Sequence, residues 1–141
     1  MDDDLQELYQ AVILEHNRTP CNKYVPESYH THADGYNPSC GDKVSVYVNF
    51  NGCVISELAF FGEGCAISQA SASLMAQLLK NKTKAEALSI ADDVCSGLSG
   101  GNVDLGRYGD VGALAGVRKF PMRIKCATIA WHTLQDAIRR M

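Results

Sequence analysis

Hydrophobic side chains near the start of the chain recur every three or four positions, which is the spacing of one face of a helix. The recurring positions are Leu5, Leu8, Tyr9, Val12, Ile13 and His16. Acidic residues precede them, where the helix dipole favours negative charge. Pro20 cannot continue a helix, because its nitrogen carries no hydrogen. The pattern predicts a first helix that ends at Pro20, with His16 packed and hydrogen-bonded on its inner face.

An alternating pattern, typical of strands, replaces the helical one in the middle of the chain. Hydrophobic positions alternate with other side chains from Val44 to Phe50 and again from Cys53 to Phe61. Asn51-Gly52 lies between these runs, and this dipeptide is the strongest short signal for a β-hairpin. We therefore predict a hairpin. The polar segment before it, residues 18–41, is predicted to be a long ordered loop or a short strand plus a loop.

Helical patterns return after the hairpin. The first of them begins at Cys65, runs to about Lys80 and is rich in alanine and serine, which let another backbone approach closely. Thr83 and Glu86 have the spacing of a capping box and predict a helix that reaches about Cys95. Pro121 suits the first turn of a final helix.

The final helix keeps one face apolar, and that face includes the single tryptophan, Trp131. We expect Trp131 in the core. Between the last two helices, residues 96–102 form a glycine-rich break and residues 110–116 a short helical turn. The order of elements predicts one α+β domain over residues 1–141. Its small antiparallel sheet has three strands, at least the two of the hairpin, and packs with about five helices on one face.

Composition narrows the functional classes. The chain has 141 residues, a hydrophobic fraction of 46% and a net charge of −3, which suit a soluble globular protein. It lacks a dense stripe of lysine and arginine, so we expect no nucleic-acid partner. It also lacks an apolar run of about 20 residues, so we expect no membrane span. The acidic start is unlike a secretory signal and predicts a cytoplasmic protein.

Six cysteines in a reducing compartment point to metal binding, catalysis or simple burial rather than to disulfides. Cys40, Asp42, Cys65 and Cys126 offer three thiolates and a carboxylate, a set that suits tetrahedral zinc. No CxxC pair sharpens the signal. The competing interpretation is three unrelated buried cysteines and a solvated aspartate, and spacing alone leaves both open.

The other cysteines and histidines carry weaker signals. Cys53 and Cys95 are expected to be small buried hydrophobic residues, whereas Cys21 is expected to be a free surface thiol. His30 and His32 are interpreted as solvated loop histidines, because four ligands complete a zinc site without them. His132 is expected to be exposed.

Three local sequences resemble the iron–sulfur cluster assembly proteins IscU and SufU, the IscU/NifU-N family. They surround the three cysteines, in the order Asn37-Pro38-Ser39-Cys40-Gly41-Asp42, Phe61-Gly62-Glu63-Gly64-Cys65-Ala66-Ile67-Ser68-Gln69-Ala70-Ser71-Ala72-Ser73 and Arg123-Ile124-Lys125-Cys126-Ala127-Thr128-Ile129-Ala130-Trp131. The first helix, over residues 8–16, resembles that of the family as well. The resemblance covers essentially the whole chain.

Two features resemble the SufU branch rather than the IscU branch. IscU proteins carry a histidine immediately before the third cysteine, where this chain has Lys125. Residues 97–119 resemble the insertion that distinguishes SufU. The resemblance implies zinc ligation by Cys40, Asp42, Cys65 and Cys126.

The resemblance also implies a zinc-dependent sulfurtransferase. Cys40 would accept persulfide sulfur from a SufS-like, pyridoxal-phosphate cysteine desulfurase and pass it towards downstream iron–sulfur assembly proteins. In this family a histidine of the desulfurase takes the place of Cys40 on zinc. Arg123 is a candidate for steadying the freed thiolate, or else a solvated helix charge.

Two alternatives stay open. One is an IscU-type scaffold that assembles a [2Fe–2S] cluster on the same three cysteines, since thiolates bind either zinc or iron–sulfur clusters. The other is a structural zinc module that only docks a partner.

Overall fold

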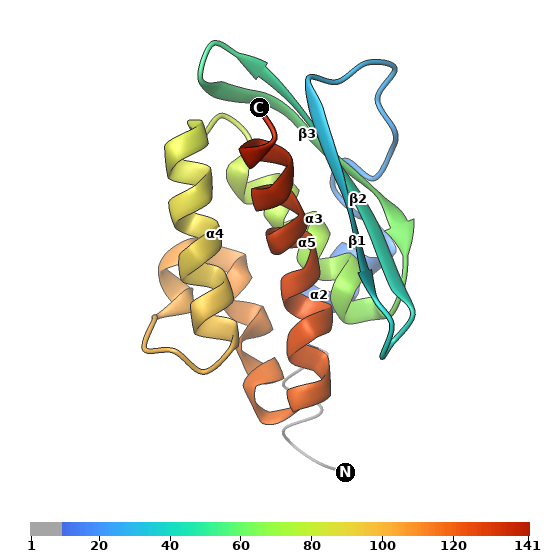
Figure 1. Cartoon of the computed structure of the whole chain (residues 1–141). Helices are drawn as coiled ribbons and strands as arrows, with labels where there is room; N and C mark the ends of the chain where they lie inside the picture. Colours follow the sequence, from blue (N-terminus) through green and yellow to red (C-terminus); the bar gives the residue numbers. More distant parts are fainter. Residues whose placement is uncertain (1–9) are drawn as a thin grey trace.

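A three-stranded antiparallel sheet forms one side of the molecule in the computed structural model, which describes residues 10–141 (Figure 1). The strands are β1 (Thr31–Asn37), β2 (Asp42–Asn51) and β3 (Val54–Glu63), in the spatial order β1-β2-β3. The predicted sheet is confirmed. Of the two possibilities for residues 18–41, the short strand plus loop is the one found.

The predicted hairpin joins β2 and β3. Asn51 pairs with Val54, so Gly52 and Cys53 form the turn between them. Gly52 has a φ of +66°, a left-handed conformation that glycine adopts without strain. The expectation that Cys53 begins a strand and is buried is wrong. Because Cys53 occupies the turn, its side chain is exposed.

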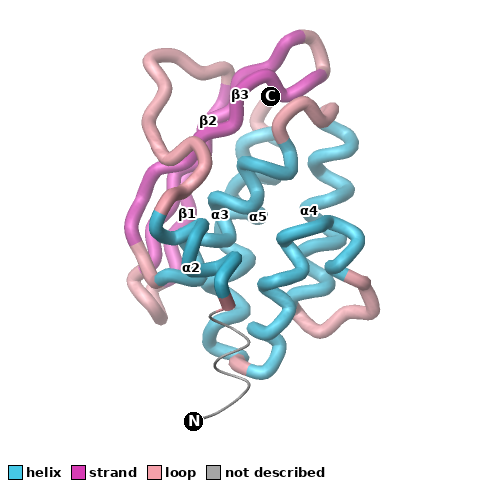
Figure 2. Tube along the Cα trace, turned by 180° about the vertical axis from the view of Figure 1, so that it is seen from behind, coloured by secondary structure: helices cyan, strands magenta, loops and turns pink. Residues whose placement is uncertain are grey.

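The helices lie on one face of the sheet, as Figures 1 and 2 show from opposite sides. The helical elements are α2 (Ala11–Arg18), α3 (Ala66–Leu79), α4 (Lys84–Leu98), η1 (Leu105–Lys119) and α5 (Pro121–Arg139). Helices α3 and α5 lie next to the sheet, and α4 lies beyond them (Figure 1). The predicted arrangement of an antiparallel sheet with helices on one face is confirmed.

The first helix ends at Arg18, two residues before Pro20. The predicted helical positions Leu5, Leu8 and Tyr9 lie outside the described residues. His16 is buried, as predicted, and its Nδ1 lies 2.7 Å from Ser73 Oγ on α3. This hydrogen bond fixes α2 against α3.

The capping box of α4 is present in full. Thr83 Oγ1 accepts from the backbone N–H of Glu86 at 3.1 Å, and Glu86 Oε1 accepts from the N–H of Thr83 at 3.0 Å. The helix continues to Leu98, so the glycine-rich break begins later than predicted. The expected turn at residues 110–116 belongs to the longer element η1, which is a 3₁₀ helix interrupted at Tyr108-Gly109.

Helices α3 and α5 meet through small and hydroxyl side chains. Trp131 is fully buried, as predicted, and its Nε1 donates to Ser71 Oγ at 2.8 Å. Ser71 in turn donates to the carbonyl of Ala127 at 2.5 Å. Close approach of these helices fixes the position of the cysteine on α5.

Among the described residues, no helix is both long enough and apolar enough to span a bilayer.

Candidate metal centre

The turn between β1 and β2 positions two of the predicted ligands. The carbonyl of Asn37 accepts from the N–H groups of Cys40 and Gly41, at 3.3 and 2.8 Å. Gly41 has a φ of +72°, which lets the chain reverse so that Asp42 opens β2. The turn holds Cys40 half-buried at the end of the sheet, beside the first turns of α5.

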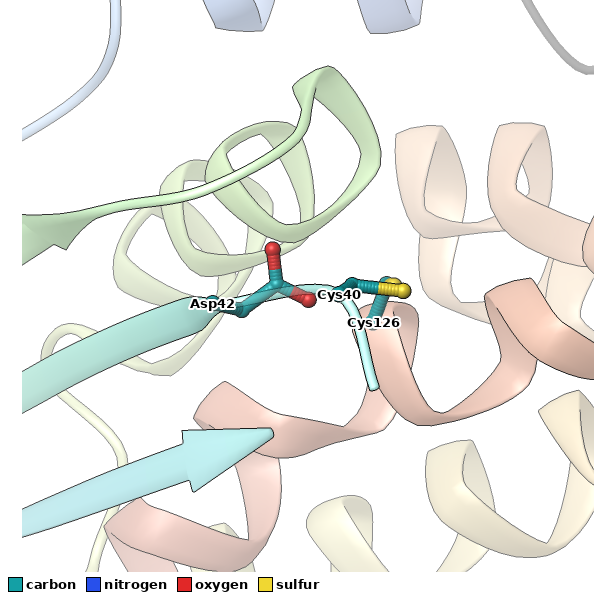
Figure 3. A group of neighbouring side chains, drawn as sticks. All are labelled: Cys40, Asp42 and Cys126. Carbon is teal, nitrogen blue, oxygen red and sulfur yellow. The ribbon is translucent and has the colours of Figure 1, made fainter. Parts of the chain in front are cut away.

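Three of the four predicted ligands converge. One ligand atom from each of Cys40, Asp42 and Cys126 lies within 4.8 Å of the others. Figure 3 shows the two sulfur atoms side by side, with a carboxylate oxygen of Asp42 directed towards them. Cys126 is fully buried and Asp42 is 1% exposed, whereas Cys40 is only half-buried. The cluster is therefore open to solvent on its Cys40 side.

Hydrogen bonds hold both oxygens of Asp42. Its Oδ1 accepts from the backbone N–H of Cys65 at 2.9 Å and from Ser68 Oγ at 3.2 Å. Its Oδ2 accepts from Asn37 Nδ2 at 3.3 Å. Burial alone would raise the pKa of Asp42, but hydrogen bonds from Cys126, Cys65, Ser68 and Asn37 outweigh it, and the pKa is lowered. Asp42 is thus a fixed anion.

Cys126 lies in an environment that disfavours a free thiolate. Its pKa is raised by burial first, and then by hydrogen bonds to Asp42 and Cys40 and by the charges of Cys65 and Asp42. The sulfurs of Cys126 and Cys40 lie 3.8 and 4.0 Å from the carbonyl oxygen of Met122. Without a cation, Cys126 is a thiol, and a metal ion would have to displace its proton.

Cys65 is the predicted ligand that stands apart, since its sulfur is not in the 4.8 Å group. Its backbone caps the N-terminus of α3 and donates to Asp42, so Cys65 contacts the cluster through its main chain. Gly64 allows this close approach. A Cβ atom at Gly64 would overlap Asp42 Oδ1 and lie 2.6 Å from Ser68 Oγ.

The donor set fits a borderline metal ion such as zinc. Thiolate sulfur and carboxylate oxygen are both zinc ligands, and a fully buried carboxylate with a lowered pKa would supply part of the balancing charge. Once ionised, the two sulfurs would repel each other and the buried carboxylate, and a bound cation would offset that repulsion.

The histidines of residues 30–32 do not join the cluster. His30 is exposed, stacks on Phe50 and accepts from the N–H of Phe50 at 2.9 Å. His32 is not in a loop: it belongs to β1, is half-buried and stacks on Tyr47.

The other cysteines also lie outside the cluster. Cys95 is buried, as predicted, and burial followed by the charge of Asp92 raises its pKa to about 12. Its sulfur lies 3.9 Å from Nδ1 of His132, which is exposed as predicted. Cys21 is half-buried rather than a surface thiol, because its backbone N–H is tied to Ser73.

Asn37 and Ser68 have no role in the sequence interpretation, although both contact the cluster. Their only signal in the sequence is their place inside the first two cysteine motifs. Arg123, the candidate partner of a freed thiolate, is half-buried in the first turn of α5.

The chain is similar in sequence to several proteins of iron–sulfur cluster assembly. The family model of the NifU-like N-terminal domain matches residues 8–140. The iron–sulfur cluster assembly scaffold protein IscU of Streptococcus pyogenes serotype M1 is 41% identical, over 96% of this chain and 86% of the relative. The zinc-dependent sulfurtransferase SufU of Bacillus subtilis (strain 168) is 39% identical, over 97% of this chain and 93% of the relative.

Solved structures agree on the fold. A protein from Fervidobacterium islandicum AW-1, described as an iron–sulfur cluster assembly scaffold protein for the SUF system, superposes with a TM-score of 0.84 at 34% identity, covering 94% of this chain and 98% of that chain. The N-terminal part of a nitrogen-fixing NifU-like protein from Brucella abortus superposes with a TM-score of 0.88 at 25% identity, covering 97% of this chain and 96% of that chain.

Proposed function

The chain belongs to the NifU-like N-terminal domain family of iron–sulfur cluster assembly proteins, and we propose that it is a zinc-dependent sulfurtransferase of the SufU type. In this proposal Cys40, Asp42, Cys65 and Cys126 bind zinc. Cys40 is also the residue that accepts sulfur from a SufS-like cysteine desulfurase. The sulfur then passes to downstream proteins of iron–sulfur assembly.

The observation that carries the proposal is the unequal setting of the two clustered thiols. Cys126 is fully buried within a helix, whereas Cys40 is half-buried on a turn with open space around Gly41. A sulfur acceptor has to meet a partner's persulfide at the surface, and Cys40 is the cluster thiol that can do so. Cys126 is in the position of a holding ligand.

Bound zinc would keep the cysteine sulfurs deprotonated at neutral pH. For transfer, the Cys40 thiolate attacks the outer sulfur of the persulfide on the desulfurase. A sulfur–sulfur bond forms at Cys40, the original persulfide bond breaks, and the cysteine of the desulfurase leaves as a thiolate. No external oxidant or reductant is needed, because the sulfane sulfur is exchanged between two thiolates.

Asp42 would hold its place throughout this exchange. Its Oδ1 is tied to the N-terminus of α3 by Cys65 and Ser68, so Asp42 would stay fixed while Cys40 leaves the metal. The turn that carries Cys40 would supply the movement. Arg123, in the first turn of α5, is retained as the candidate cation for the freed thiolate.

A scaffold that assembles a [2Fe–2S] cluster is the second candidate function. It is favoured by the IscU relative, whose identity of 41% is as high as that of the SufU relative at 39%. Lys125, in place of the histidine that precedes the third cysteine in IscU proteins, favours the transferase. Metal and sulfide analysis after anaerobic purification separates the two. Stoichiometric iron and acid-labile sulfide without zinc would support the scaffold and overturn the transferase.

The decisive experiment is persulfide transfer from the cognate desulfurase to zinc-loaded protein. We expect one persulfide at Cys40, identified by alkylation and mass spectrometry, and an increase in desulfurase turnover. Cys40→Ala should abolish both, and Cys53→Ala, which removes the exposed thiol of the hairpin turn, should change neither. If the Cys40→Ala variant still activated the desulfurase fully, the protein would dock onto the desulfurase without accepting sulfur.

A further inference from the structure

We infer that Asn37 is a positioning residue that holds Cys126 and Asp42 in the metal centre while leaving the sulfur of Cys40 free to move. The inference rests on the metal binding in the proposed function. It concerns a residue that ligates nothing itself.

The side-chain amide of Asn37 lies between two ligands. Its Nδ2 is 3.3 Å from Asp42 Oδ2 and 3.7 Å from Cys126 Sγ, and the side chain is 4% exposed. A carboxylate oxygen and a cysteine sulfur both accept hydrogen bonds, so the amide group facing them has to be the NH₂. Its two hydrogens match the two acceptors.

The backbone of Asn37 acts on the third ligand differently. Its carbonyl accepts from the N–H groups of Cys40 and Gly41 and so closes the turn that carries Cys40. These bonds fix the main chain of the turn but leave the Cys40 side chain to rotate. Asn37 therefore immobilises two ligand atoms and only the backbone of the third.

The other contacts of Cys126 do not replace this donor. Met122 offers a carbonyl oxygen at 3.8 Å, Asp42 a carboxylate, and Cys40 a sulfur that would itself be a thiolate on the metal, so all three are acceptors. None of them can give a hydrogen bond to a metal-bound sulfur. The N–H group of Asn37, 3.7 Å from Cys126 Sγ, is the contact that can.

The consequence is a division of labour within the donor set. Because Asn37 orients Asp42 and Cys126, these two ligands would stay on the metal when Cys40 leaves it. Loss of such an outer partner typically costs about 10- to 100-fold in metal affinity. Without Asn37, the metal would be lost when Cys40 leaves it.

The test compares wild type with Asn37→Ala and with Asn37→Leu, which keeps the branched shape of the side chain but has neither the NH₂ donors nor any group that can bind a metal. Asn49→Ala is the matched control, because its amide donates to Ser28 O at 3.0 Å and Glu57 Oε1 at 2.7 Å, outside the cluster. Each protein is loaded with Zn²⁺ or Co²⁺, and folding is checked by circular dichroism.

We expect Zn²⁺ release to a chromophoric chelator to be about 10- to 100-fold faster in both Asn37 variants, and faster still after alkylation of Cys40. The sulfur-to-cobalt charge-transfer band should move to lower energy, since a thiolate without its N–H donor gives up charge more easily. Asn49→Ala should match wild type in both measurements. If Asn37→Ala misfolds, Asn37→Leu gives the result.

The outcomes separate the two proposals. If wild type takes up neither Zn²⁺ nor Co²⁺, the proposed function and the inference fall together. If wild type binds both ions and the Asn37 variants show its release rate and its charge-transfer band, the inference alone is overturned. Faster Zn²⁺ release with an unchanged charge-transfer band would also overturn the inference. That result would mean that the whole site is less stable, not that the sulfur has lost a hydrogen-bond donor.

Discussion

The backbone N–H of Cys65 donates to Oδ1 of Asp42 at 2.9 Å, which joins the N-terminus of α3 to the start of β2. The unpaired N–H groups of a helix N-terminus favour an anion. Here the anion is the carboxylate predicted to bind the metal. The contact therefore links the fold of the hairpin to the geometry of the cluster.

Replacing Asp42 with alanine should weaken metal retention by at least about tenfold, because a ligand and its network of donors are lost together. Cys40 should react faster with iodoacetamide, since it is less often bound to metal. Zinc release and alkylation rates measure the two effects. Asp34→Ala, which removes an exposed carboxylate bonded to Ser45, is the control and should behave as wild type. Unchanged zinc content together with unchanged alkylation would contradict the prediction.

Replacing Gly64 with alanine should disturb the cluster without any change of ligand. The new Cβ would overlap Asp42 Oδ1, and relief of such crowding typically costs about 1–3 kcal/mol. We expect faster zinc release and a lower melting temperature. Gly106→Ala, where the Cβ has 3.1 Å to its nearest neighbour, should change both much less. Equal effects from the two variants would argue against close packing at Gly64.

The raised pKa of Cys95, about 12, predicts a loss of stability at alkaline pH. An unfolded thiol ionises near pH 8.5, so above that pH the unfolded state releases a proton that the folded state keeps. The free energy of unfolding should then fall by up to about 1.4 kcal/mol per pH unit. Below pH 8.5 this contribution is fully present. Urea unfolding of the metal-free protein at pH 8, 9 and 10 measures the slope.

Cys95→Ala should have a shallower alkaline slope than wild type, whatever its stability at pH 8. Cys53→Ala, at the exposed hairpin turn, should keep the wild-type slope. Identical slopes in all three proteins would refute the link to Cys95.

Replacing Ser73 with alanine should destabilise the protein by about 1–3 kcal/mol, because buried polar groups lose their partner. Ser73 Oγ accepts from the N–H of Cys21 and bonds His16, both at 2.7 Å. Ser89→Ala on the exposed face of α4 is the control and should stay within about 0.5 kcal/mol of wild type. Chemical denaturation at pH 7 decides between these outcomes.

The sequence predicts the elements of this fold well where local chemistry determines them. The hairpin signal at Asn51-Gly52, the capping box at Thr83 and the proline that opens α5 are all local, and each is found. For residues 18–41, which contain strand β1, the sequence leaves two possibilities open: a long loop, or a short strand plus a loop. The residues of β1, such as Gly35 and Asn37, have little strand propensity, and its pairing with β2 supplies the stability.

The site is predictable in part for the same reason. Cys40 and Asp42 share one turn, so their proximity follows from two residues of spacing and a glycine. The approach of Cys126 depends on the packing of α5, which no local pattern encodes. The contacts of Asn37 form only when three segments of the chain meet, so its place in the family motif is the only sign of them in the sequence. Cys53 is exposed because the turn is formed by Gly52 and Cys53, and the sequence does not show which two residues form it.

The position of Cys53 at the tip of the hairpin has a practical consequence. Strand β2 has 10 residues, with Asp42 at one end and the Cys53 turn just beyond the other. At about 3.3 Å per residue, the two ends lie roughly 30 Å apart. A fluorophore or spin label attached there would sit far from the cluster and report on encounters with a second protein. The same exposure makes Cys53 a natural point of unwanted cross-linking between copies in air, so handling under reductant protects the sample.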